Sequence, residues 1–224
     1  MPGAINDSPT VSQPRSNANV SVSASPATAP VALSQMKANR VRALAISTVT
    51  PLSTSVTVAV TADLLMGAAS PPSIHSLIDA LAASRADAVV LAGNIGENDG
   101  QIGQFFKRLR QAVACPIGFV PGNQDLFYRN ETSSEALLGT HLPALCKTHG
   151  VQFLPGNPLT IGSLGIVGSL AWYDYSAADP TANLTLEDHV QFKQDRNVPE
   201  ALRIDWAWSD LEVAENSTRA LEAD

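Results

Sequence analysis

The fold is decided between Val56 and Asp125 by three short apolar runs, each followed directly by polar residues: Val56-Thr57-Val58-Ala59-Val60 before Thr61-Ala62-Asp63-Leu64-Leu65, Ala88-Val89-Val90-Leu91-Ala92 before Gly93-Asn94-Ile95-Gly96-Glu97, and Ile117-Gly118-Phe119-Val120 before Pro121-Gly122-Asn123-Gln124-Asp125. Runs of this length that are continuously apolar and rich in β-branched residues are typical of buried strands. The sequence therefore predicts three core strands whose ends carry the polar chemistry of the chain.

The two segments between these runs have helical periodicity. Apolar residues recur at helical spacing from Ile74 to Leu81, and again from Ile102 to Val113. Strands that alternate with amphipathic helices form a parallel sheet covered on both faces, and right-handed crossovers bring the carboxyl ends of its strands to one edge. We therefore expect an α/β fold in which the three polar groups meet, at the edge where open α/β sheets place their sites.

The rest of the chain gives weaker local signals. The segment 134–148 is expected to be a helix interrupted by Gly139 and Pro143, with a short strand at 151–154 after it. Gly162-Ser163 predicts a hairpin between two short runs. The polar segment 181–199 is expected to be a loop, whereas Ser209-Asp210-Leu211-Glu212 has the pattern of a capping box that opens a final helix.

The polar groups resemble the motifs of the calcineurin-like metallophosphoesterases. Successive strands of that family end in D-x-H, G-D-x-x-D and G-N-H-D/E, and here the corresponding residues are Asp63-Leu64-Leu65, Gly93-Asn94-Ile95-Gly96-Glu97 and Gly122-Asn123-Gln124-Asp125. The separations also agree, with 31 residues from Asp63 to Asn94 and 29 from Asn94 to Asn123. Trp172-Tyr173-Asp174-Tyr175-Ser176 resembles a segment of one bacterial branch, so that the likeness covers roughly 56–215.

This resemblance implies a β-sandwich flanked by helices, from which the C-terminal strands that carry the family's last histidines are missing. It also implies a divalent metal cofactor (Mn, Fe or Zn), with Asp63, Asn94 and Asn123 at metal-ligand positions. Gln124 stands at the position of the catalytic His, followed by Asp125, and Trp172 and Tyr173 are candidate substrate-binding residues.

The departures from the motifs fall on the residues that carry the chemistry. Leu65 replaces a ligand His and has no lone pair for a cation. Asn94 replaces the bridging Asp and lacks the charge that lets one group hold two cations about 3.5–4 Å apart. Gln124 cannot release a proton near pH 7, as a general acid must. The four histidines, His75, His141, His149 and His189, lie in none of the motif positions. Metal binding is therefore expected to be weakened or lost.

Composition sets the broad class. The chain has 224 residues, is 45% hydrophobic and has a net charge of −7, which suits a domain with a substantial core and argues against nucleic acid as a partner. Residues 1–37 are expected to be disordered, 38–55 to be a linker or edge strand, and 56–224 to be the metallophosphoesterase-like domain. Two cysteines without framework spacing, and the lack of a signal sequence or membrane span, predict a cytoplasmic protein that does not bind membranes.

Three functional hypotheses follow from these observations. The first is a phosphoester hydrolase of the metallophosphoesterase type with weak or lost activity. The second is a non-catalytic module that holds a small phosphorylated molecule or a phosphoprotein through backbone N–H groups and Asn side chains. The third is a degenerate copy without function. The oligomeric state does not follow from the sequence.

Overall fold

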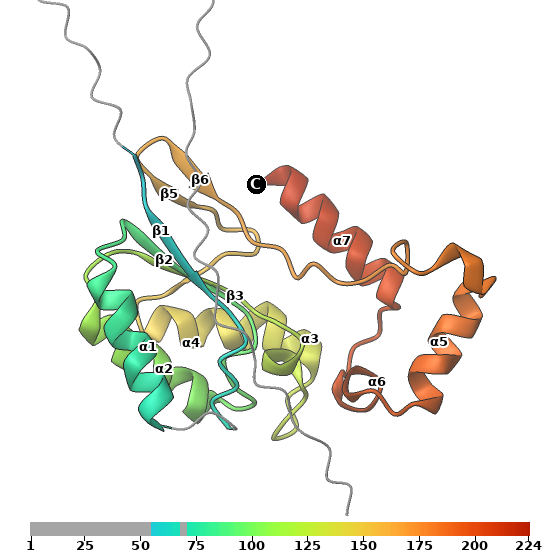
Figure 1. Ribbon diagram of the computed structural model, residues 1–224. Coiled ribbons are helices and arrows are strands. Elements are labelled where there is room, and N and C mark those ends of the chain that lie inside the picture. The colour runs from blue at the N-terminus through green and yellow to red at the C-terminus, as the bar shows by residue number, and fades with distance from the viewer. Residues whose placement is uncertain (1–54, 68–70) are drawn as a thin grey trace, which may run out of the picture.

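A four-stranded parallel sheet forms the centre of the fold (Figure 1). The structure is a computed structural model that describes residues 55–67 and 71–224. The predictions for 1–37 and for 38–54 lie outside the described residues. The strands follow one another in the sheet in sequence order: β1 (Val58–Thr61), β2 (Ala88–Ala92), β3 (Ile117–Val120) and β4 (Gln152–Phe153). The predicted β-α-β-α-β order and the parallel sheet are confirmed.

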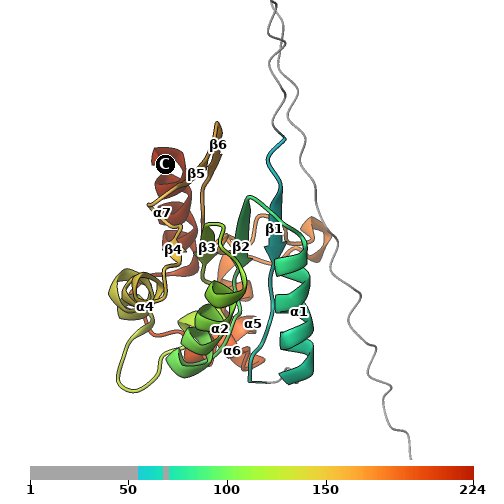
Figure 2. The same ribbon diagram turned by 90° about the vertical axis from the view of Figure 1, so that its left-hand side faces the viewer.

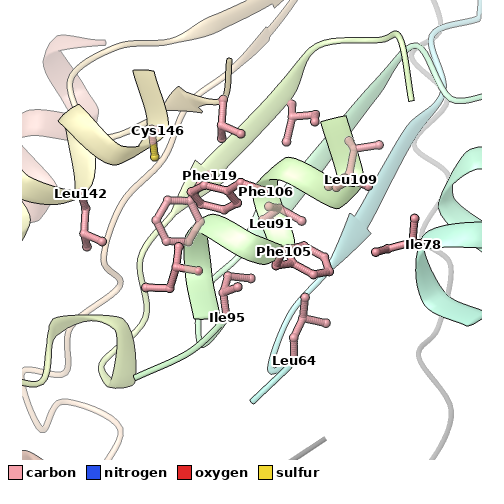
Figure 3. Packing of buried hydrophobic residues seen from close by; sticks show 14 of the residues in the cluster. Leu64, Ile78, Leu91, Ile95, Phe105, Phe106, Leu109, Phe119, Leu142 and Cys146 are labelled. Atoms are coloured by element: carbon pink, nitrogen blue, oxygen red, sulfur yellow. The ribbon is translucent and has the colours of Figure 1, made fainter. Parts of the chain in front are cut away.

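Three helices cover one face of this sheet (Figure 2). They are α1 (Pro71–Ala83), α2 (Asp99–Ala112) and α4 (Leu142–Thr148). All three lie on the same side because a sheet with sequential strand order and right-handed crossovers puts every connection on one face. Phe106 of α2 packs edge-to-face on Phe119 of β3, with ring centroids 5.2 Å apart, at the centre of the buried cluster (Figure 3).

The sequence predicts that the helix at 134–148 is interrupted, but in the structure this segment stays helical and changes from one helical type to another. The chain runs through α3 (Ser134–Ala136) and the π-helix η2 (Leu137–His141) into α4. Pro143 cannot donate a backbone hydrogen bond, and a π-helical turn before it lets the chain continue without the bond that an α-helix would require there. The segment therefore stays helical.

The other face of the sheet carries an antiparallel hairpin. Its strands, β5 (Leu159–Ile161) and β6 (Leu164–Ile166), confirm the hairpin predicted around Gly162-Ser163. Leu159 packs with Ala88 and Val90 in a second, smaller apolar cluster. Among the described residues the second layer is thus a two-stranded hairpin, and the full sandwich implied by the resemblance stays a prediction.

The C-terminal third is more helical than the sequence analysis predicts. The expected loop at 181–199 is wrong, because this segment contains most of η3 (Pro180–Ala182), all of α5 (Leu186–Asp195) and the first residue of α6 (Pro199–Arg203). Thr185 and Asp188 form a capping box that begins α5. The final helix α7 (Asp210–Ala223) begins with the capping box predicted at Ser209 and Glu212. No helix in the described part of the chain is long and apolar enough to cross a membrane.

Phe106 is expected to be essential for stability. Phe106→Ala removes a fully buried ring between α2 and β3 and should lower the free energy of unfolding by about 4 kcal/mol. Phe192→Ala is the matched control, since Phe192 is 53% exposed and contacts only the Arg196 guanidinium in a ring interaction, and its loss should cost below about 1 kcal/mol. Urea unfolding of both variants measures the difference, and equal costs would contradict this description of the core.

Candidate functional site

The polar groups that follow β1, β2 and β3 meet at the carboxyl edge of the sheet, as predicted. Backbone hydrogen bonds join the first two loops: the Asp63 N–H donates to the Gly93 carbonyl at 3.0 Å, and the Leu65 N–H donates to the Asn94 carbonyl at 3.0 Å. Asp63, Leu65 and Asn94 all have positive φ, an uncommon conformation for residues other than glycine. We call Asp63, Asn94, Asn123, Gln124 and Asp125 the strand-end cluster.

Asp125 joins the loop after β3 to the loop after β2. Its carboxylate is completely buried and accepts four backbone N–H groups, from Asn94 at 2.6 Å, Ile95 at 2.8 Å, Gly96 at 3.1 Å and Gly122 at 2.9 Å. Burial raises the pKa of the Asp125 carboxyl above its usual value, and the four donors offset part of that rise. Asp125 was predicted as a catalytic-site residue, but its contacts are those of a residue that positions the loops.

The two loops approach each other so closely that two glycines are needed. A Cβ on Gly122 would lie 2.3 Å from the side-chain oxygen of Asn94, and a Cβ on Gly93 would lie 2.7 Å from the Gly122 nitrogen. Gly93 also has a φ of +83°. The close approach of the two loops therefore explains the glycines of the second and third motifs in this chain without any ligand.

Asn94 bonds directly to Asp63. Its side-chain Nδ2 donates to Asp63 Oδ1 at 2.9 Å, and its Oδ1 accepts the Gln124 backbone N–H at 3.0 Å. The Gln124 N–H fixes the orientation of the Asn94 side-chain amide, because only the amide oxygen can accept a hydrogen bond from it. The amide hydrogen of Asn94 therefore contacts the carboxylate that the resemblance assigns to a metal.

Asn123 also uses its amide hydrogens on a carboxylate. Its Nδ2 donates to Oε1 of Glu200 in α6, across 77 residues of sequence. Arg203 at the end of α6 forms an ion pair with Glu97 at 3.0 Å and lies over the Phe127 ring, and its carbonyl accepts the Tyr128 N–H at 2.8 Å. Helix α6 thus lies against the loops that carry the strand-end cluster.

The strand-end cluster does not fit a dinuclear metal centre. Leu65 offers no donor atom to a cation, and the amide hydrogens of Asn94 face the one carboxylate that would have to bind it, that of Asp63. The amide of Asn123 is held by Glu200, which stands at no metal position of the resemblance. Within residues 55–67 and 71–224, no three His, Cys, Asp or Glu side chains lie close enough to hold a metal ion. Asp63 is therefore the sole carboxylate at a position that the resemblance assigns to a metal ligand, which is a weak set for a divalent cation.

The backbone donors at this edge are also already used. The N–H groups of Asn94, Ile95, Gly96 and Gly122 bond to Asp125, and that of Gln124 bonds to Asn94. No hydrogen bond among the described residues engages the side-chain amide of Gln124. A phosphate group would find few free N–H donors here.

Trp172 and Tyr173 belong to a separate aromatic cluster, formed with Tyr175, Trp206 and Trp208. Trp172 stacks on Tyr173 at 5.3 Å and meets Trp206 edge-to-face at 4.9 Å. This aromatic cluster surrounds Asp210 at the start of α7, which accepts hydrogen bonds from Trp172 Nε1 at 2.7 Å, the Tyr175 hydroxyl and Lys193 Nζ at 2.9 Å. These contacts give the two predicted substrate-binding residues a structural role.

Burial raises the pKa of Tyr173 above its usual value, and the charges of Asp210 and Glu200 raise it further. Glu200 itself accepts a hydrogen bond from Asn123 of the strand-end cluster. Glu200, Arg203 and Asp210 were not predicted as site residues. A local signal existed for Asp210, since it follows the predicted cap Ser209, but nothing local marks Glu200 or Arg203.

Comparisons with known proteins support the fold. No protein-family profile and no curated protein matches the chain. The crystal structure of phosphopantetheinyl hydrolase from Mycobacterium tuberculosis is similar, with a TM-score of 0.58 and 21% sequence identity over 74% of this chain. The chain spans 61% of the length of that protein. At this identity the likeness shows the fold alone.

Asp125→Asn is expected to destabilise the fold. The amide keeps one acceptor oxygen and places an NH₂ group against at least one pair of backbone N–H groups, so the free energy of unfolding should fall by about 3 kcal/mol. Asp79→Asn, on the exposed face of α1, is the control and should change stability by below about 0.5 kcal/mol. Urea unfolding at pH 7 measures both, and an unchanged Asp125→Asn variant would contradict the role of Asp125 in joining the loops.

The Asp210 contacts predict a pH dependence. Burial alone would raise the Asp210 pKa, but hydrogen bonds from Tyr175, Trp172 and Lys193 lower it below its usual value. A lowered carboxyl pKa contributes stability above the unfolded pKa, and this contribution is lost as the pH falls through the folded value. Wild type should therefore lose more stability than Asp210→Asn between pH 6 and pH 3 in urea unfolding. Parallel curves for the two proteins would show that Asp210 contributes nothing.

Proposed function

We propose that this chain is a phosphoesterase-like protein in which side-chain amides have replaced the metal centre, so that hydrolysis of phosphoesters is weak or absent. The fold likeness to a hydrolase and the strand-end motifs support the phosphoesterase origin. The observation that carries the proposal is the 2.9 Å hydrogen bond from Asn94 to Asp63, because it satisfies the carboxylate with a neutral donor. A metal ion would have to break this bond before it could bind Asp63.

The loss of chemistry extends beyond the metal positions. Gln124, at the position of the family's catalytic His, has no proton to give near pH 7. The loops and α6 carry the carboxylates of Asp63, Glu97 and Glu200. The nearby guanidinium groups of Arg203 and Arg129 are already paired, with Glu97 and Asp99 respectively. Without bound cations this arrangement repels a phosphate group. Both features favour slow turnover over an alternative catalytic mechanism at the same place.

The same charges weigh against the hypothesis of a phospho-ligand-binding module. A site that holds phosphate without metal needs free backbone N–H groups or an excess of Arg and Lys. Here the N–H groups of the loops bond to Asp125 and Asn94, and Arg203 is paired with Glu97. A small phosphorylated molecule or a phosphoprotein therefore remains a prediction from sequence, and metal-independent binding of inorganic phosphate would favour it.

The decisive experiment compares wild type with a variant that restores the motif residues. Purified wild type, Asp63→Ala and the triple variant Leu65→His, Asn94→Asp, Gln124→His are assayed with aryl phosphomonoester, aryl phosphodiester and a phosphopantetheinyl ester in excess Mn²⁺ and in EDTA. We expect wild type to be no faster than Asp63→Ala. We expect the triple variant to gain turnover that EDTA removes, because Asn94→Asp exchanges the amide donor for a ligand.

Asn94→Asp alone adds a second readout that does not depend on turnover. It places two carboxylates side by side, which raises their proton affinity and favours a cation between them. Mn²⁺ should raise the melting temperature of Asn94→Asp by several degrees and leave wild type unchanged. Turnover by wild type that disappears both in EDTA and in Asp63→Ala would overturn the proposal.

A further inference from the structure

Helices α4 and α7 lie on the side of the molecule away from β1 (Figure 2). Residues of both helices line a groove. Its volume is about 960 Å³, at the upper end of the range for small-molecule sites. Its floor and walls come from η2, α4, the segment 150–157, the segment 168–170 and α7. Neither Asp63 nor any other member of the strand-end cluster lines it. The groove is therefore independent of the proposed function.

The groove exists because α7 is held mainly near its ends. At one end Asp210 bonds to the aromatic cluster, and at the other the Asp224 carboxylate accepts the Gly156 N–H at 3.2 Å. Val213 is the one buried residue of α7. The helix spans the opening with little packing beneath its middle.

The lining has the chemistry of an apolar site with one cation. Its apolar side chains include Leu138, Val151, Phe153, Leu170, Trp208 and Val213. Lys147 is the one charged residue among the described residues that line the groove, and its side-chain ammonium has no hydrogen bond or ion pair within the described part of the chain. In a protein with a net charge of −7, this leaves a local positive group beside apolar walls.

Two side-chain amides in the lining, those of Gln152 and Asn157, already use their hydrogen-bond donors within the protein. The Gln152 side chain donates to the carbonyls of Asn157 and Pro158 at 3.0 and 2.7 Å, and Asn157 Nδ2 donates to the Phe153 carbonyl at 3.2 Å. These donors satisfy the groove's own backbone. With Gln152 and Asn157 taken, the uncharged polar side chains that remain in the lining are Ser169, Asn216 and Ser217. These are too few to pair the polar backbone of an inserted peptide, most of which would lie against apolar walls at a cost. An unbranched hydrocarbon chain has no such requirement.

We propose that this groove binds a free long-chain carboxylic acid, with its hydrocarbon chain against the apolar walls and its carboxylate beside Lys147. The acid suits the charge of the groove, and its chain buries apolar surface without polar groups that need partners. The site is one of ligand binding, separate from hydrolysis.

Calorimetric titration of the whole chain with the C8, C10, C12 and C14 acids, each below its micelle concentration, tests this proposal. Affinity should rise about three- to fourfold for each added methylene until the groove is filled. Gly139→Phe should reduce it about tenfold or more, because Gly139 lines the groove and a Cβ there meets no atom within 4 Å. Gly165→Phe, equally unobstructed but on the hairpin, is the matched control and should bind as wild type does.

The variant Lys147→Met tests the contribution of the charge to binding separately from that of the apolar walls. It keeps an apolar stem, so it should weaken binding of the C12 acid two- to fivefold and leave binding of the C12 alcohol unchanged, as expected for an exposed ion pair. Melting curves of each variant confirm that it folds. Equal affinity of Gly139→Phe and wild type, or affinity that does not depend on chain length, would overturn the proposal. So would a wild-type dimer in sedimentation that Gly139→Phe dissociates, since the groove would then be filled by a second copy.

Discussion

The geometry at the carboxyl edge of the sheet depends on one buried carboxylate. Asp125 accepts three backbone N–H groups from the loop after β2 and a fourth from Gly122 in its own loop. A completely buried carboxylate is tolerated only when such donors replace its hydration. The close approach that it enforces also requires Gly93 and Gly122. The position of Asn94, and with it the chemistry of the edge, follows from this arrangement.

With the loops held in this arrangement, the identity of residue 94 decides whether the carboxyl edge of the sheet requires a bound cation. An aspartate there would face Asp63 with like charge and would need a cation between the two. The asparagine instead joins Asp63 to the Gln124 backbone through one amide, with no cation required. Helix α6 contributes two further contacts. Glu200 accepts a hydrogen bond from the Asn123 amide, and Arg203 forms an ion pair with Glu97. The polar side chains of the edge thus satisfy one another, so the loops can keep this arrangement without a bound cation.

The sequence predicted what local patterns encode. Apolar runs and helical periodicity gave the strand order, and three strand-end motifs placed Asp63, Asn94 and Gln124 together, as their hydrogen bonds show. The contacts of α6 were not predicted, because Glu200 lies 77 residues from Asn123 and nothing in its neighbourhood marks it. Helix α5 was missed because most of its residues are polar and none is buried, so that its capping box at Thr185 was the main signal. The groove beside α7 depends on how elements distant in sequence are spaced, which periodicity does not report.

The central claim is that an amide, and not a metal ion, holds Asp63. Titration of wild type with Mn²⁺, followed by electron paramagnetic resonance of the free ion, tests it most directly. The account predicts that the free Mn²⁺ signal in the presence of protein matches buffer up to about millimolar Mn²⁺, as one carboxylate with neutral neighbours is a weak ligand set. One or two tightly bound ions per chain, lost in Asp63→Ala, would contradict it.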